Sequence, residues 1–149
     1  LGEIFWYQAD VFPDNIADTT STFMYWSGRG LAWAETKLVA LYRHKNDSTL
    51  YRGRYLQINN DVIQSVSDIT VTWNHLDSYG AYALEYNPVT DGFWVLASDS
   101  FNQYIIFEVD SNFQYLNTVG IIDGDPMGIT KGPNSELYLS YLERQKLPS

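Results

Sequence analysis

The stretch DGFWVLASDSFNQYIIFEVD, residues 91–110, contains two apolar runs separated by a polar break. The runs at 93–97 and 104–109 are rich in aromatic and β-branched side chains, which suit the pleated surface of a strand. Asp99, Ser100 and Asn102 lie between them, and such side chains bond the local backbone in turns. The stretch therefore predicts a β-hairpin.

The same pattern recurs on both sides of this hairpin. Residues 126–141, PMGITKGPNSELYLSY, and residues 28–47, GRGLAWAETKLVALYRHKND, repeat its order of small residue, apolar residue, turn and strand. The small residues Gly30, Ala83 and Gly128 are 53 and 45 positions apart. A period of this length with several strands per unit is the signature of propeller blades.

Each unit is predicted to hold four antiparallel strands. We expect strands at 81–86, 93–97, 104–110 and 113–121 in the central unit, and at 38–42, 49–58 and 67–73 in the one before it. The first strand of each unit lies nearest the axis, where only Gly or Ala lets backbones approach closely. We therefore expect valine to be tolerated less well at Gly128 than at Gly124. No helical period is present, which favours an all-β fold.

A family resemblance follows from these residues. Pro126, Gly128, Ile129, Leu137 and Tyr138 fit a blade pattern P-x-G-[IL]-x(6-8)-[LI]-[YW]-V, and Leu84, Trp94, Val95 and Asp110 fit its counterpart in the central unit. The chain thus resembles the six-bladed β-propellers of the NHL, SMP-30/gluconolactonase and SdiA-regulated types. The resemblance implies four-stranded antiparallel blades, about three blade equivalents in this chain, as a partial propeller or half of a two-chain ring. The lactonase-type propellers hold a divalent ion, but Glu35, Glu85 and Asn87 do not fall on their ligand pattern.

We expect one propeller-like domain over residues 1–149. Its approximate units are a partial one at 1–29, full ones at 30–80 and 81–126, and a partial one at 127–149. Strands at 3–10 and 22–26 would be the outer two of a blade, and the end of the chain would supply an inner two. Three arrangements stay open: two chains exchanging half-blades, a piece of a longer propeller, or an open array covered by other subunits.

Composition excludes several classes of function. The formal net charge of −9 repels phosphate backbones and anionic lipid, so we expect no nucleic-acid partner and no membrane insertion. The chain has no cysteine, which excludes disulfides, cysteine-ligated zinc and thiol catalysis. It begins at Leu1 without a basic-then-apolar leader, so a mature product, an excised piece and an incomplete observation all remain open.

The candidate site lies on the links that lead into the first strand of each unit, at 26–30, 73–82 and 122–128. In a propeller these links gather at one end around the central channel, where rings stack on sugars and carboxylates or amides bind hydroxyls. The alternative is that the polar residues only form turns and the tryptophans only pack. The candidate ligand-binding residues are Trp26, Arg29, Trp73, Asn74, His75, Asp77, Tyr79, Asp123 and Asp125.

We predict no catalytic residue, metal ligand or cofactor. Asp123 and Asp125 could face one cation, but no calcium-binding loop follows them. His75 near Asp77 could act as a base, but the chain has no nucleophile motif beside it.

Two functions are therefore carried forward. The first is a non-catalytic binding or assembly module at an extracellular or virion surface. It would recognise a carbohydrate or other polar ligand, or a protein partner or second copy through its open blade edges. The second is a lactonase- or esterase-like hydrolase that uses a metal in the channel. A metal-dependent protein would lose thermal stability on chelation, and a binding module would not.

Overall fold

The computed structural model describes residues 4–7, 16–20, 25–60, 62–134 and 136–142, and in the first two segments only the backbone. These residues form antiparallel β-sheets, and no helix occurs among them, so the all-β prediction is confirmed. No helix in this part of the chain is long and apolar enough to cross a membrane.

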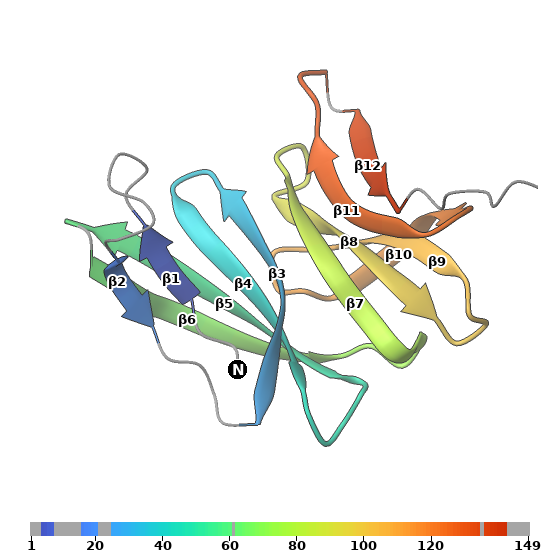
Figure 1. The fold of residues 1–149 in the computed structure, drawn as a ribbon, viewed down its shortest axis with the longest axis horizontal. Helices are drawn as coiled ribbons and strands as arrows, with labels where there is room; N and C mark the ends of the chain where they lie inside the picture. Colours follow the sequence, from blue (N-terminus) through green and yellow to red (C-terminus); the bar gives the residue numbers. More distant parts are fainter. Residues whose placement is uncertain (1–3, 8–15, 21–24, 61, 135, 143–149) are drawn as a thin grey trace, which may run out of the picture.

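Two four-stranded sheets make up the centre of the molecule, and in each the strands follow one another in sequence order (Figure 1). The first contains β3 (Trp26–Ala34), β4 (Lys37–His44), β5 (Leu50–Asn59) and β6 (Val62–Thr72). The second contains β7 (Leu76–Asn87), β8 (Gly92–Asp99), β9 (Tyr104–Val109) and β10 (Tyr115–Ile122). Two-stranded sheets flank them: β1 (Ile4–Tyr7) with β2 (Ile16–Thr20), and β11 (Pro126–Lys131) with β12 (Leu137–Tyr141).

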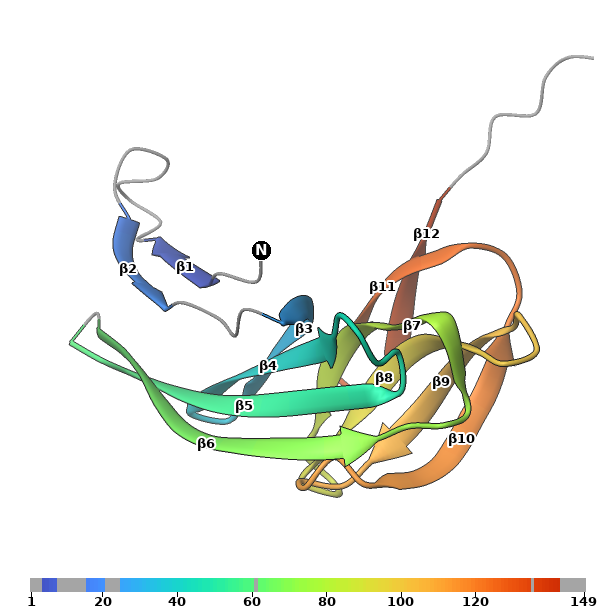
Figure 2. The same ribbon diagram turned by 90° about the horizontal axis from the view of Figure 1, so that it is seen from below.

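The first strands of successive sheets lie side by side. Strand β7 contacts β3 on one side and β11 on the other, while β2 contacts β6, the last strand of its sheet (Figure 1). The described sheets form an open arc rather than a closed ring (Figure 2). The first strands β3, β7 and β11 therefore lie next to one another along the row of sheets.

The opening hairpin is confirmed as β8 and β9. In the turn between them, Asp99 Oδ1 accepts the N–H groups of Phe101 and Gln103, both at 2.9 Å. The segment DSFNQ that forms this turn has a counterpart, DSNFQ, directly after β9. There Asp110 Oδ1 accepts the N–H groups of Asn112 and Gln114 at the same distance. One turn design thus closes two successive hairpins of the sheet.

The main core lies between the two four-stranded sheets and combines aliphatic with aromatic side chains. Phe113 is fully buried, and its ring stacks on Phe93 at 5.1 Å between centroids. Its backbone has φ 62°, a conformation that costs a bulky residue strain. Gly53 makes room for the ring, because a Cβ at position 53 would lie 2.1 Å from it. The packing of Phe113 therefore depends on a glycine in the other sheet.

The small first-strand residues have different surroundings. A Cβ on Gly30 would lie 3.1 Å from both Cβ and N of Leu84 on β7, so Gly30 does sit at a close strand contact. A Cβ on Gly128 would meet only the Ser140 hydroxyl, at 3.0 Å, whereas Gly124 has φ 90°. The expectation that valine is tolerated less well at 128 than at 124 is thus wrong. Apart from β7 and β12, the described residues place no strand beside β11, so Gly128 is not crowded. The left-handed φ of Gly124 restricts substitution more strictly.

The first part of the chain also departs from expectation. The second strand lies at 16–20, whereas residues 22–24 of the predicted strand at 22–26 lie outside the described residues. Trp26 begins β3 instead, opposite His44 on β4. Its ring is buried in the first large sheet, so Trp26 belongs to that sheet and not to the partial unit before it.

A candidate ligand-binding end of the sheets

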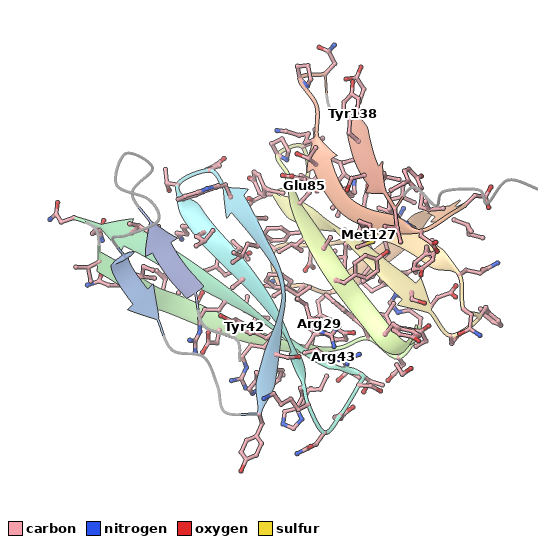
Figure 3. The ribbon with its side chains drawn as sticks, viewed as in Figure 1. Arg29, Tyr42, Arg43, Glu85, Met127 and Tyr138 are labelled. Atoms are coloured by element: carbon pink, nitrogen blue, oxygen red, sulfur yellow. The ribbon has the colours of Figure 1, made fainter. Side chains whose placement is uncertain are left out.

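Arg29 and Tyr79 are brought together where β3 and β7 lie side by side. Arg29 Nη1 donates a hydrogen bond to the Tyr79 carbonyl at 3.2 Å. Arg43 on β4, which the sequence did not single out, donates from its own Nη1 to the neighbouring Ser78 carbonyl. Figure 3 shows the two arginines next to each other. Strand β4 pairs with β3, so the sheet itself places Arg43 beside Arg29.

Asp77 holds the backbone that these arginines contact. Its Oδ1 accepts the N–H of Tyr79 at 2.8 Å and of Gly80 at 3.0 Å, and its Oδ2 accepts the Ser98 hydroxyl. The carboxylate is thus engaged in the turn that opens β7. It supports the site rather than facing a ligand.

The two predicted tryptophans lie in packed positions. Trp73 is only 2% exposed, and its Nε1 donates to the Phe113 carbonyl at 2.9 Å. Trp26 is covered by the guanidinium of Arg52, 4.4 Å from the ring centre, and by His44 against its edge. Both rings stabilise the sheets and are not available to stack on a ligand.

Asn74 and His75 line a pocket of about 540 Å³ between the link to β7 and the outer strands β9 and β10. The His75 ring packs against Phe107 at 4.9 Å and Tyr115 at 4.5 Å. Burial lowers the pKa of His75, while Asp99 acts in the opposite direction. Its Nε2 is shielded and has no hydrogen-bond partner. The pocket thus combines aromatic faces with polar atoms that could bind hydroxyl groups.

Asp123 and Asp125 lie on the link between β10 and β11. The Asp125 carbonyl accepts the N–H of Leu142 at 3.0 Å, so its backbone ties this link to the end of β12. Within the described residues, no three His, Asp or Glu side chains lie together in a way that could hold a metal ion. Asp123 is exposed on this link and Asp125 is half-buried.

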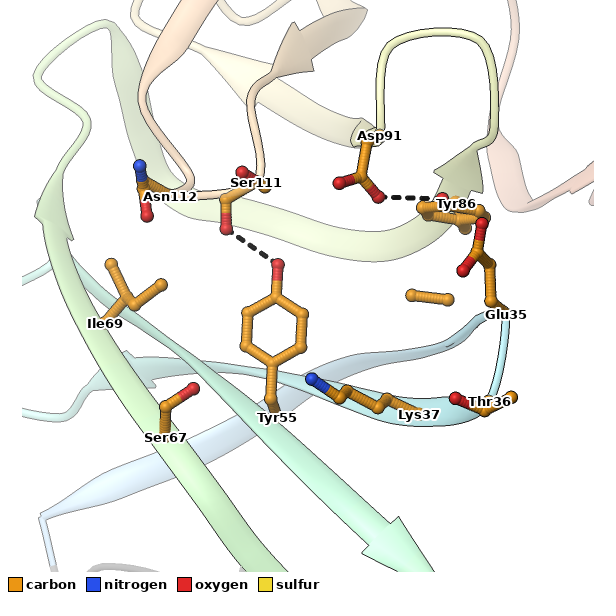
Figure 4. A pocket seen from close by; sticks show the side chains of 11 residues that line it. Glu35, Thr36, Lys37, Tyr55, Ser67, Ile69, Tyr86, Asp91, Ser111 and Asn112 are labelled. Atoms are coloured by element: carbon orange, nitrogen blue, oxygen red, sulfur yellow. Dashed lines mark hydrogen bonds between the residues drawn. The ribbon is translucent and has the colours of Figure 1, made fainter.

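A second pocket, of about 350 Å³, lies at the opposite end of the two large sheets (Figure 4). Tyr55 donates to the Ser111 carbonyl at 2.7 Å, and Tyr86 donates to Asp91 Oδ1 at 2.8 Å. Burial raises the pKa of each tyrosine to about 12. The sequence did not predict this pocket. Its walls include the β3–β4 and β7–β8 turns, which lie at the same end of the two large sheets because the two hairpins are equivalent. Its other lining residues are Ala34, Glu35, Thr36, Lys37, Ser67, Ile69 and Asn112.

No protein-family model matches the chain, and no curated protein or solved structure matches it. Its function is therefore argued from its own residues.

Proposed function

We propose that the chain is part of a β-propeller and acts as a non-catalytic binding and assembly module. The sheet order supports this proposal, since each large sheet is a four-stranded antiparallel meander that starts at the strand nearest its neighbour. A propeller of this kind normally has at least four blades, and this chain contributes two complete sheets and two halves. We infer that further strands complete it.

The observation that carries the proposal is a pair of exposed apolar faces, one on β3 of the first large sheet and one on β12 of a flanking sheet. On β3, Ala32 packs in the core, whereas its neighbours Leu31 and Trp33 are each 52% exposed on the opposite face. At the other end, Leu139 packs toward the second large sheet, and its neighbour Tyr138 is 55% exposed. Exposed apolar faces of this kind mark sites of protein contact.

The two half-sheets are complementary in position. Strand β11 lies beside β7 and so occupies a first-strand place, whereas β2 lies beside β6 and occupies a last-strand place. The order β11, β12, β1, β2 would therefore make one complete four-stranded blade across two chains or across a longer protein. Such completion also pairs the free edges of β12 and β1, which would otherwise be open to aggregation.

The ligand role is proposed for the pocket around His75. Tyr115 and Phe101 supply exposed rings at its wall, and Asn74 and Gln103 supply amide groups. Rings beside amide donors suit a sugar or another polar ligand. The hydrolase alternative has no comparable support, because the described residues gather no set of metal ligands.

Trp33→Asp tests the assembly role. An acid on the open face of β3 should prevent another sheet from packing there, so the mass measured by light scattering should fall toward that of one chain. Val89→Asp is the matched control, since Val89 is 79% exposed in the turn between β7 and β8, away from the open faces. An equal effect of both substitutions, or of neither, would contradict the proposed interface.

A further inference from the structure

We propose that Leu31 of a second copy of the chain packs on Gly128, in the hollow that β11 and β12 leave open. The inference rests on the proposed assembly role and deepens it, because it commits to one partner and names the two residues that meet. It follows from the contact that the two large sheets make with each other within one chain.

The first hairpins of three successive sheets have the same register. In each hairpin the pairing shifts directly before the small residue of the first strand, which is Gly30 on β3, Ala83 on β7 and Gly128 on β11. At that step Gly30 pairs with Leu41, and Gly128 pairs with Ser140. The three hairpins are therefore equivalent, so a contact made by one of them predicts the contact of its counterpart.

The residue that follows the small one packs on the preceding sheet. A Cβ on Gly30 would lie 3.1 Å from the Leu84 Cβ, so Leu84 of the second large sheet covers Gly30 of the first. Ile129 is the counterpart of Leu84 on β11, and it packs against the apolar cluster to which Ala83 also contributes. The same step thus occurs at both junctions between sheets.

Leu31 is the counterpart of Leu84, and Trp33 is the counterpart of Tyr86, but their surroundings differ. Leu84 and Tyr86 are 4% and 6% exposed, because the first large sheet covers them, whereas Leu31 and Trp33 are each 52% exposed. Strand β2 lies beside β6, the last strand of that sheet, and the face of its first strand stays open. Leu31 therefore lacks the small residue on which its counterparts pack.

The other half of the same contact is open at the end of the arc formed by β11 and β12 (Figure 1). Gly128, Thr130, Tyr138 and Ser140 form two cross-strand pairs on the face that points away from the second large sheet. A hollow of about 320 Å³ lies between these strands. A Cβ on Gly128 would meet only the Ser140 hydroxyl, so the glycine is open to a side chain from outside.

A second copy is the partner that supplies both halves. Leu31 and Gly128 of one chain cannot meet, because β7 lies between β3 and β11. In a pair of copies each Leu31 can pack on the Gly128 of the other, so two-fold symmetry uses one contact twice. Two copies would also form a ring of six blades, within the range of about four to eight that propellers have, whereas one chain would give three.

Cysteine cross-linking tests the contact, since the chain has no cysteine of its own. The variant Leu31→Cys/Gly128→Cys is oxidised with copper–phenanthroline at micromolar concentration and analysed by non-reducing electrophoresis. At the equivalent contact within the chain the two Cβ positions are 3.1 Å apart, near the ~3.8 Å of a disulfide. We expect a covalent species of twice 17.1 kDa that a reducing agent returns to 17.1 kDa.

Leu31→Cys/Val119→Cys is the matched control, because Val119 is exposed on β10 and lies outside the proposed contact. This control and both single-cysteine variants should stay at 17.1 kDa. Trp33→Cys/Thr130→Cys joins the pair two residues further along the same strands and should cross-link without a substitution at glycine. Far-UV dichroism checks that each variant is folded.

Light scattering of the reduced double variants separates this inference from the assembly role. A larger mass than one chain, with cross-linking no faster than in the control, would overturn the contact of Leu31 with Gly128 and leave assembly through other surfaces. A mass of 17.1 kDa before oxidation would overturn the second copy as partner and the assembly role of the isolated chain together.

Discussion

At the scale of single residues, the core between the large sheets depends on how closely a ring and a backbone approach. Gly53 of β5 faces the edge of the Phe113 ring, and an added Cβ would lie 2.1 Å from it. The ring itself is locked by Phe93, on which it stacks, and by a backbone of positive φ. Neither partner can move aside without disturbing the other sheet.

Gly53→Ala should therefore destabilise the domain by about 1–3 kcal/mol or more, as overpacking of a close-packed core does. Urea unfolding followed by tryptophan fluorescence measures the change. Gly120→Ala is the control, because a Cβ there has no neighbour within 4 Å, and its effect should be small. Equal stability of the two variants would show that Phe113 is not held as described.

Tyr55 gives a prediction for alkaline pH. Burial raises its pKa to about 12, and the tyrosine reference is 10.0, so the folded state favours the neutral hydroxyl. The stability that this contributes is fully present below pH 10 and is lost as pH rises toward 12. Tyr55→Phe should cost about 1 kcal/mol at pH 7 through loss of the bond to Ser111. It should also reduce the alkaline fall in melting temperature.

Tyr25→Phe is the matched control for this tyrosine, because its side chain is exposed just before β3. It should leave both the neutral stability and the alkaline fall unchanged. A Tyr55→Phe protein that loses stability as steeply as the unmodified chain between pH 10 and 12 would rule out this role.

At the scale of elements, two similar turns connect strands β8, β9 and β10 of the second large sheet. In each turn an aspartate side chain accepts two backbone N–H groups, that of Asp99 after β8 and that of Asp110 after β9. Asp110→Ala should destabilise the domain by about 1–3 kcal/mol, because two donors lose a charged acceptor. Thermal unfolding measures the loss of stability. Asp123→Ala is the control, because Asp123 is exposed and its substitution should change the melting temperature little. A melting temperature equal to that of the control would contradict the importance of the turn.

The elements were predictable where the sequence alternates or repeats. The strand at 137–141 and the hairpin of β8 and β9 follow from β-branched and aromatic runs bounded by turn residues. The strand at 16–20 was not predictable, because IADTT has no apolar run to mark it. Trp26 was assigned to the wrong strand, since an apolar run alone does not show which sheet buries it.

The candidate site was predictable only in part. The repeat correctly indicated that the links into β3 and β7 meet, which brings Arg29 to Tyr79. Arg43 was missed because it lies inside a strand, and only the register of β4 against β3 places it there. Trp73 was included for its residue type, but its indole N–H is bonded to the carbonyl of Phe113, forty positions away in sequence. A contact between residues this far apart in sequence cannot be recognised from the residues around either one.

At the scale of the whole molecule, we expect the open faces on β3 and β12 to determine whether the chain associates. Burying an aliphatic or aromatic side chain contributes about 1.5–3 kcal/mol, so covering Leu31, Trp33 and Tyr138 is worth several kcal/mol before ordering costs. This is a sizeable part of the net stability of a domain. An isolated chain with both faces open should therefore associate.

The mass of the unmodified chain by light scattering at micromolar concentration tests this account most directly. One chain has a mass of 17.1 kDa. If the half-sheets complete one another between two copies, the measured mass should be twice that value, and other pairings of the open faces should give larger species. A stable, non-aggregating species of 17.1 kDa across the concentration range would contradict the propeller account.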